Sequence, residues 1–269
     1  MATSPFSENV VLITGAAAGI GRELALALAE KGAFLSLGDV DAANLTRTAE
    51  QCRILGGKAV AVPTDITHKE ACRQLIEATV SEYGRIDTLI NNAGITMVAR
   101  LDEMQDLDLF ERVMGVNFFG SVYCTFFALP YLKKSRGRIV GVSSLAGKAG
   151  LPKRSAYSAS KHAMAGFFDT LRIELAEDGV SVTMVYPDFV ATGLRKQAYG
   201  PMGKTLDADP VDNARAMDVT TCARLIIEAV ALRKRECFLT FRGKMGQWLK
   251  LAAPGLIDRI TIKAAVKGH

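Results

Sequence analysis

Short apolar runs alternate with longer stretches of helical periodicity along most of the chain. Seven of the runs are rich in β-branched residues and short enough to be strands. They cover residues 10–14, 34–39, 59–63, 88–91, 138–143, 181–186 and 237–240. Runs with so few polar positions indicate strands that are buried on both faces, which is typical of a parallel sheet. The pattern predicts an α/β fold with a doubly wound, seven-stranded parallel sheet and helices on both faces.

Length and composition agree with a single domain. The chain has 269 residues, of which 49% are hydrophobic and 23% charged, so it can bury one large core. No repeat, linker or low-complexity segment divides it, and we predict one domain over residues 1–269. Two segments fall outside the alternation of strands and helices. They are a loop broken by Gly and Pro at about 193–217 and a C-terminal extension at about 242–269.

A glycine-rich turn joins the first predicted strand to a helix rich in Ala and Leu. Glycine permits positive φ and close approach of the backbone, so the free amides that begin this helix can meet a pyrophosphate, whose charge the helix dipole favours. A strand, such a turn and a helix in this order form the context that a nucleotide-binding motif requires. The positions expected to contact a cofactor are Gly15, Ala18, Gly19, Ile20 and Gly21. Glycines that only form a tight turn are the alternative.

Asp39 ends the second predicted strand. An acidic residue there can accept hydrogen bonds from the adenosine ribose and repels a 2′-phosphate, which favours NAD over NADP. Ala18 and Val40 agree with this preference, because neither position supplies a cation for the extra phosphate. Asp39 could instead cap a helix that begins near Ala42.

Tyr157 and Lys161 are four positions apart in a predicted helix, so they share one face of it. A fixed cation favours the phenolate and lowers the pKa of a tyrosine, which would make this pair a device for proton transfer. Ser144 follows the fifth predicted strand, where its hydroxyl could hold a substrate oxygen beside the phenol. The alternative is a packed tyrosine next to a lysine that extends into solvent.

With these motifs in order, the chain resembles the short-chain dehydrogenase/reductase family in its single-domain form, over about residues 9–241. Beyond the glycine turn and Asp39, the family's cofactor contacts match Asp65, Ile66, Asn91, Ala93, Gly94, Tyr157, Lys161, Pro187, Val190 and Thr192. The family's catalytic tetrad matches Asn117, Ser144, Tyr157 and Lys161. Asp188 is a departure, because the family usually has glycine at this position.

The resemblance implies a Rossmann-type fold and an NAD(P)-dependent oxidoreductase in which Tyr157 is the general acid and base. It also implies that Lys161 bonds the nicotinamide ribose and that Asn117 holds a water that links Lys161 to solvent. We expect the substrate to be a hydrophobic secondary alcohol or ketone of cyclic, aromatic or steroid-like type. The alternatives are an NADP-dependent 3-oxoacyl reductase, a sugar epimerase, and a non-catalytic protein that senses nucleotides.

The loop at 193–217 lies where the family closes over its substrate, and its glycines suit a lid that moves. Its residues Leu194, Tyr199 and Met202 could supply an apolar underside, and a surface loop with no such role is the alternative.

The run 116–132 has no charged residue and is rich in Phe. It is shorter than the ~20 apolar residues that span a membrane. In the family this helix is the usual subunit interface, so we expect a homodimer or homotetramer.

Charge, cysteines and histidines exclude several other classes of protein. The net charge of +5 is modest and we expect it to be scattered, so no nucleic-acid partner is predicted. The five cysteines contain no Cys-x-x-Cys pair and suggest buried thiols in a reducing compartment, and the three histidines suggest no metal site. No secretory signal opens the sequence, so a cytoplasmic location is expected.

The C-terminal extension combines apolar positions at roughly helical spacing with several Lys and Arg. A basic amphipathic helix of this kind can lie on a membrane surface or cover an apolar pocket. Packing on its own domain or on a partner subunit is the interpretation that the sequence favours.

Overall fold

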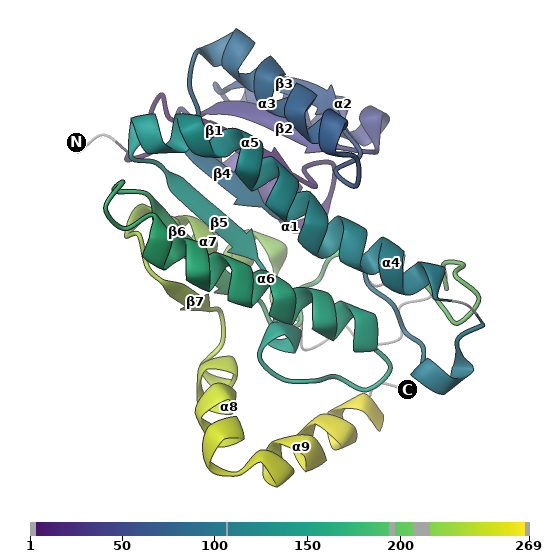
Figure 1. Ribbon diagram of the computed structural model, residues 1–269. Coiled ribbons are helices and arrows are strands. Elements are labelled where there is room, and N and C mark those ends of the chain that lie inside the picture. Colours follow the sequence, from purple (N-terminus) through teal and green to yellow (C-terminus); the bar gives the residue numbers. More distant parts are fainter. Residues whose placement is uncertain (1–3, 106, 194–196, 207–215, 267–269) are drawn as a thin grey trace.

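The computed structural model describes residues 4–105, 107–193, 197–206 and 216–266, with only the backbone for 264–266 (Figure 1). Its strands are β1 Val10–Thr14, β2 Phe34–Asp39, β3 Lys58–Pro63, β4 Thr88–Asn91, β5 Arg138–Val142, β6 Ser181–Tyr186 and β7 Glu236–Phe238. Its α-helices are α1 Gly19–Ala29, α2 Ala42–Ile54, α3 Lys69–Tyr83, α4 Asp108–Met114, α5 Gly120–Ser135, α6 Ser155–Glu174, α7 Val219–Ala231, α8 Phe241–Ala252 and α9 Pro254–Val266. The shorter helical segments are η1 Leu101–Glu103, η2 Gly115–Phe119 and η3 Leu145–Gly147.

The strands form one sheet in the order β3-β2-β1-β4-β5-β6-β7, and every neighbouring pair is parallel. The predicted fold class is therefore confirmed, with shifts at four strand ends, two of them in β7, which begins one residue earlier and ends two residues earlier than expected. Strand β3 begins one residue earlier than expected and β5 ends one residue earlier. The expectation for β7 was wrong at its end, because Thr240 caps helix α8 by accepting a hydrogen bond from the amide of Gly243 at 3.1 Å.

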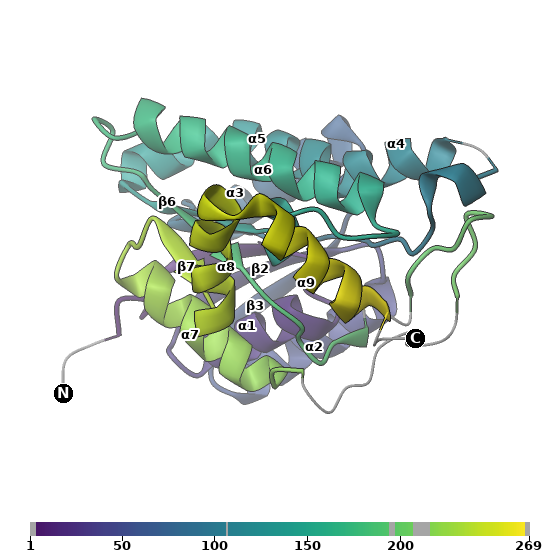
Figure 2. The same ribbon diagram turned by 90° about the horizontal axis from the view of Figure 1, so that it is seen from below.

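Helices cover both faces of the sheet, because successive side chains of each buried strand point to opposite sides. In β1, Val11 and Ile13 pack against Leu24 of α1, whereas Leu12 packs on the other face in a cluster that includes Leu75 of α3. Figure 2 shows α1, α2 and α7 on one side of the sheet and α3, α5 and α6 on the other. This doubly wound arrangement places the crevice for a ligand where the strand order reverses, at the carboxyl ends of β1 and β4.

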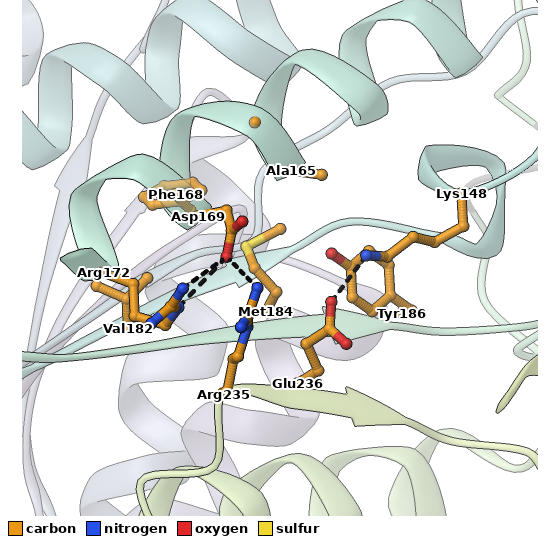
Figure 3. A pocket seen from close by; sticks show the side chains of 11 residues that line it. Lys148, Ala165, Phe168, Asp169, Arg172, Val182, Met184, Tyr186, Arg235 and Glu236 are labelled. Carbon is orange, nitrogen blue, oxygen red and sulfur yellow. Dashed lines mark hydrogen bonds and ion pairs between the residues drawn. The ribbon is translucent and has the colours of Figure 1, made fainter. Parts of the chain in front are cut away.

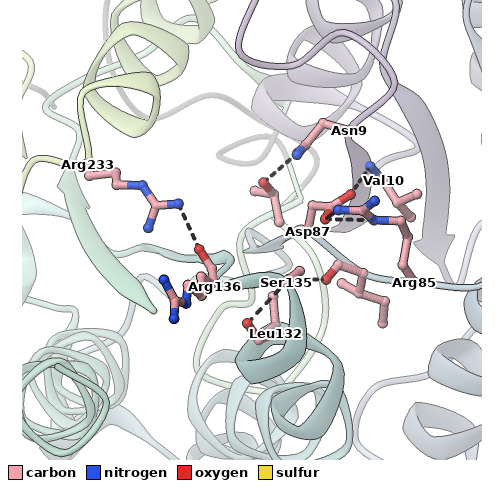
Figure 4. A network of polar contacts seen from close by, with 10 residues as sticks. Asn9, Val10, Arg85, Asp87, Leu132, Ser135, Arg136 and Arg233 are labelled. Atoms are coloured by element: carbon pink, nitrogen blue, oxygen red, sulfur yellow. Dashed lines mark hydrogen bonds and ion pairs between the residues drawn. The ribbon is translucent and has the colours of Figure 1, made fainter. Parts of the chain in front are cut away.

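A polar network holds the amino ends of the strands, opposite to the crevice at their carboxyl ends (Figure 4). Asp87 is buried, and its Oδ2 accepts a hydrogen bond from the Val10 amide at 2.9 Å. The Arg85 side chain donates to Oδ1 of the same carboxylate at 2.9 Å. On the other side of the network, Arg233 donates to the carbonyl of Arg136 at 2.7 Å. This network lies at the amino ends of the strands, so its role is to hold the sheet together.

The segment Asp108–Ser135 is long and apolar enough to span a membrane by length and composition, with a mean hydropathy of 1.4. In the fold it forms α4, η2 and α5, which lie along one face of the sheet, and 39% of its most apolar part is buried. The inner side of α5 packs through Cys124, Ala128 and Leu132, while Phe126 is 69% exposed.

All five cysteines are free thiols. Four are buried, as expected, whereas Cys237 is only partly buried. Burial raises the pKa of the Cys52 thiol to about 11 and that of Cys222 to about 12, so neither is an activated nucleophile.

Candidate active site

The glycine turn has a geometry that only glycine can supply. Gly15 and Gly19 have φ of 68° and 55°. A Cβ on Gly15 would lie 2.7 Å from the Cα of Ala93, and one on Gly21 would lie 2.0 Å from the carbonyl oxygen of Gly15. Ala18 stands at the N-cap of α1 without a side-chain cap, so the first amides of this helix remain available to a ligand. This arrangement is more than a tight turn, because it also leaves an anion-binding helix end open.

The turn is locked to the end of β4 by Thr14 and Asn92. The hydroxyl of Thr14 accepts hydrogen bonds from the amides of Asn92 and Ala93 at 3.1 and 3.2 Å. The Asn92 amide group donates to the carbonyls of Thr14 and Gly15, both at 3.0 Å. Ala93 is therefore placed directly over Gly15. Asn92 was not singled out from the sequence, although it stands between two residues that were.

Asp39 lies beside the glycine turn. Its Oδ2 accepts a hydrogen bond from the Ala17 amide at 3.0 Å, and its Oδ1 accepts one from the Asp41 amide at 3.0 Å. Helix α2 is capped by Asp41, which accepts from the Asn44 amide at 3.0 Å. The alternative that Asp39 is the helix cap is therefore wrong, and its carboxylate stays with the turn.

Ser144 and Tyr157 converge at the carboxyl end of β5. Ser144 begins η3, and its hydroxyl accepts a hydrogen bond from the Ala146 amide at 3.2 Å. Tyr157 lies in the first turn of α6. Burial raises the pKa of Tyr157, while the neighbouring Ser144 hydroxyl and the charge of Arg154 lower it. The two hydroxyls thus form one site.

Lys161 lies one helical turn after Tyr157 and is 3% exposed. Its Nζ donates to the carbonyl of Val142 at 2.9 Å and lies 5.8 Å from the centroid of the Tyr157 ring. Burial lowers the pKa of Lys161 to about 8. The sequence suggested that Lys161 lowers the pKa of Tyr157, but the groups that lower it in this structure are Ser144 and Arg154. Arg154 was missed, although its position just before α6 and three residues before Tyr157 is visible in the sequence.

Asn117 is fully buried in η2, a π-helical segment between α4 and α5. Its Oδ1 accepts from the Ile95 amide at 2.8 Å, and its Nδ2 donates to the Ile95 carbonyl at 3.0 Å and to the Ser160 hydroxyl at 2.9 Å. The hydroxyl of Ser160 in turn donates to the carbonyl of Tyr157 at 2.8 Å. Asn117 is thereby connected to the helix that carries Tyr157. A π-helical turn of this kind is rare and frequent at functional sites.

Gly94 lies between the glycine turn and the polar groups of Asn117 and Lys161. A Cβ at this position would lie 3.2 Å from Oδ1 of Asn117 and 3.4 Å from Nζ of Lys161. The backbone that follows β4 therefore runs directly past both polar groups, with no side chain between.

Three further predicted contacts lie near the carboxyl ends of β3 and β4. Asp65 and Ile66 lie in the loop after β3, and Asn91 is the last residue of β4. Oδ1 of Asp65 accepts from the amide and hydroxyl of Thr67 at 2.9 and 2.7 Å, which shapes the turn into α3. Ile66 is 6% exposed and packs against Gly120. Nδ2 of Asn91 donates to Thr125 of α5 at 3.1 Å, whereas its buried Oδ1 has no protein partner among the described residues.

The segment 187–192 connects the Ser144 loop with the glycine turn. The carbonyl of Pro187 accepts from the Leu145 amide at 3.0 Å, and Thr192 lies 3.4 Å from where a Cβ of Gly19 would be. Asp188, the departure from the family pattern, accepts a hydrogen bond from the Thr240 hydroxyl at 3.2 Å. The acidic residue therefore ties this loop to the start of α8.

The predicted substrate loop is described only in part. Leu194 lies outside the described residues. Tyr199 exchanges backbone hydrogen bonds with Thr96 and Val98 and packs in the apolar cluster that includes Tyr157. Met202 is 62% exposed, so it is not part of an apolar underside.

A separate pocket of about 220 Å³ lies between α6, β6 and β7 (Figure 3). Its wall includes an ion pair between Lys148 and Glu236 at 2.7 Å and one between Arg235 and Asp169 at 2.8 Å. Neither Ser144 nor Tyr157 lines it, so it is distinct from the proton-transfer site.

These features fit a dinucleotide. The open amides of α1 suit a pyrophosphate and the carboxylate of Asp39 suits a ribose. At Gly94 the backbone carries no side chain beside the buried Nζ of Lys161. In the part of the chain that the structure describes, no three His, Cys, Asp or Glu side chains gather as metal ligands.

Comparisons with known proteins agree with this geometry. The family model of the short chain dehydrogenases matches residues 9–201. The chain is 37% identical over 263 residues to 11-beta-hydroxysteroid dehydrogenase A of Sesamum indicum, which covers 94% of this chain and 75% of that protein. It is also 37% identical over 264 residues to 11-beta-hydroxysteroid dehydrogenase 1A of Arabidopsis thaliana, with the same coverage.

A solved structure is similar over almost the whole chain. A short chain dehydrogenase/reductase from Burkholderia phymatum in complex with NAD matches with a TM-score of 0.85 and 28% identity, covering 95% of this chain and 96% of that one. The chain therefore belongs to the short-chain dehydrogenase/reductase family and is an enzyme that oxidises alcohols or reduces ketones with a nicotinamide cofactor.

Proposed function

We propose that this enzyme interconverts a hydrophobic secondary alcohol and its ketone with NAD, using Tyr157 as the general acid and base. The observation that carries the proposal is the position of Tyr157 next to the buried Lys161, whose Nζ lies 5.8 Å from the ring centroid, with the Ser144 hydroxyl close enough to lower the pKa of the phenol. When bound, the nicotinamide supplies the hydride donor or acceptor.

The roles of the residues follow from their charges and positions. The raised pKa of Tyr157 keeps its phenol protonated at neutral pH, ready to donate to a ketone oxygen. The Ser144 hydroxyl holds and polarises the same oxygen. With a pKa of about 8, Lys161 can hold or release a proton near neutral pH, which suits a relay behind Tyr157. Asn117 fixes the backbone at Ile95 and thereby the bare stretch at Gly94 next to Lys161.

Asp39 supports NAD as the cofactor. Its carboxylate is anchored at the glycine turn by the Ala17 amide, where a 2′-phosphate would meet a negative charge. Neither Ala18 nor Val40 can offset that repulsion.

The surroundings of Tyr157 support an apolar substrate. Tyr157 and Tyr199 border a buried cluster of Met97, Ala99 and Leu109. A steroid-like or comparable cyclic substrate agrees with this cluster and with the names of the related plant proteins.

The proposal is tested with a panel of cyclic, aromatic and steroid alcohols and ketones, each assayed with NAD(H) and NADP(H) by absorbance of the reduced nicotinamide. We expect turnover of at least one apolar substrate with NAD(H), and Tyr157→Phe should abolish it while NADH binding stays within about twofold. The control is Tyr131→Phe on α5, which should leave turnover unchanged. Full turnover by Tyr157→Phe would refute the assignment.

We also propose a homo-oligomer formed through α4 and α5. Phe110, Met114 and Phe119 line a depression of about 350 Å³ on this surface, and Phe126 lies exposed further along α5. Light scattering should give a dimer or tetramer that Phe126→Glu weakens, whereas a monomer at micromolar concentration would contradict the proposal.

A further inference from the structure

Helices α8 and α9 form an arm that projects from the sheet beyond β7 (Figures 1 and 2). We call these residues, Phe241–Val266, the C-terminal arm. The inner side of α8 is tied to the catalytic end of the fold. Gly243 packs against Leu145, and Lys250 Nζ donates to the carbonyl of Lys148 at 2.6 Å.

The outer side of α8 carries an apolar stripe. Phe241, Met245, Trp248 and Leu251 recur at helical spacing and are 77%, 50%, 61% and 77% exposed. Exposed apolar side chains that lie together mark an interaction surface, whereas single ones need no explanation. The sequence favoured packing on the same domain or on a partner subunit, and the exposure of this stripe contradicts packing on the same domain.

Helix α9 extends the same kind of surface. Leu256 and Ile260 are four positions apart, so they share one face, and both are exposed. The apolar surface of the C-terminal arm thus includes residues from both of its helices.

The net charge of the protein is concentrated in the same place. Residues 241–269 contain six Lys and Arg and one acidic residue, Asp258. The whole chain contains 33 Lys and Arg and 28 Asp and Glu. Residues 1–240 therefore carry 27 of each sign, and the entire net charge of +5 resides in the C-terminal part. The expectation of scattered charge was wrong. Among the described residues, Arg242, Lys244, Lys250, Arg259 and Lys263 are exposed cations of the arm.

The combination of charge and apolar stripe decides between possible occupants. Two arms facing each other would bring like charges together, which opposes self-association through this surface. An anionic bilayer complements both features, because cations meet the headgroups while apolar and aromatic side chains enter the interface. Trp248 stands in the stripe, and tryptophan is enriched at the membrane interface. We propose that the C-terminal arm docks the enzyme on the surface of an anionic lipid bilayer.

Docking in this orientation would bring the Ser144 end of the fold close to the bilayer, because α8 contacts Leu145 directly. Given the proposed function, an apolar substrate dissolved in the lipid would have a short path to the catalytic residues. The docking itself does not depend on that function.

Trp248 is the only tryptophan of the chain, which makes the full-length protein its own probe. Vesicles of phosphatidylcholine alone are compared with vesicles that contain phosphatidylserine in addition, at about 3:1. We expect the Trp248 emission to shift to shorter wavelength, and the protein to float with the vesicles, only when phosphatidylserine is present. High salt should reduce both signals.

Two variants test the two parts of the surface. Arg242→Gln with Lys244→Gln and Arg259→Gln should weaken partitioning about 100-fold, because each basic residue near an anionic surface contributes about fivefold. Phe241→Ser with Leu251→Ser should abolish flotation at the same lipid concentration. The matched controls are Lys31→Gln with Arg47→Gln and Ile54→Ser, which change exposed residues outside the arm and should bind as the parent does.

Circular dichroism and NADH binding confirm that each variant is folded, and neither vesicle assay requires turnover. The proposal is overturned if the protein does not float with anionic vesicles, if it floats equally well with neutral ones, or if the arm variants bind like the parent. It is also overturned if the arm variants change the molecular mass in the absence of lipid, because a second copy would then cover the stripe.

Discussion

Lys161 allows a prediction in which removing a buried charge from the candidate active site stabilises the fold. Burial lowers its pKa from 10.5 to about 8, which means that the folded protein holds this ammonium less favourably than the unfolded chain does. At about 1.4 kcal/mol per tenfold, the difference corresponds to about 3 kcal/mol. Lys161→Met removes this cost and also the hydrogen bond to the Val142 carbonyl, which contributes about 1 kcal/mol. We expect the variant to be about 2 kcal/mol more stable at pH 7 and inactive.

The stability difference between Lys161→Met and the parent should depend on pH if it comes from the buried charge, whereas a packing effect would not depend on pH. Below pH 8 the lysine is protonated in both states, so the full cost is present. Between pH 8 and 10.5 the unfolded chain binds more protons than the folded one, so the parent gains stability as the pH rises. The advantage of Lys161→Met should therefore shrink by about 2 kcal/mol between about pH 7 and pH 10.

Urea unfolding of the cofactor-free protein, followed by far-UV circular dichroism at both pH values, measures this difference. Lys31→Met is the control, because its side chain lies on the surface, and it should change little at either pH. A variant that is less stable than the parent at pH 7, or a difference that does not change with pH, would refute the reasoning.

Three further predictions concern the cofactor, the phenol and the sheet. Asp39→Ala should raise the ratio of kcat/KM for NADP to kcat/KM for NAD at least ~10-fold in steady-state assays, because the substitution removes the charge that repels the 2′-phosphate. An unchanged ratio would show that Asp39 does not select the cofactor. Arg154→Gln should move the alkaline decline of ketone reduction to higher pH, because its charge lowers the pKa of Tyr157, and a pH profile identical to that of the parent would contradict this. Asp87→Ala should lower the free energy of unfolding by about 3 kcal/mol, because it leaves the buried Val10 amide without its hydrogen-bond partner. The control is Asp102→Ala, which changes an exposed carboxylate. Equal urea midpoints for Asp87→Ala and the parent would contradict the role of the network.

The fold and the positions of most candidate site residues were predictable because their signals are local. Strands that are buried on both faces leave continuous apolar runs, and a glycine turn that approaches another backbone tolerates no other residue, as the contact of Gly15 with Ala93 illustrates. Tyr157 and Lys161 share a helix face by spacing alone. Ser144 follows a strand whose neighbours set its position, so the order of the motifs sufficed to bring it to Tyr157.

What only the tertiary structure decided depends on residues that are far apart in the chain. The low pKa of Lys161 comes from burial under β5, and no local pattern reports how much water a side chain retains. The bond between Asp188 and Thr240 and the exposure of the stripe on α8 are likewise set by where distant segments pack. An amphipathic sequence shows that a helix has an apolar face, but whether that face meets the protein's own core or remains open is determined by the folded arrangement.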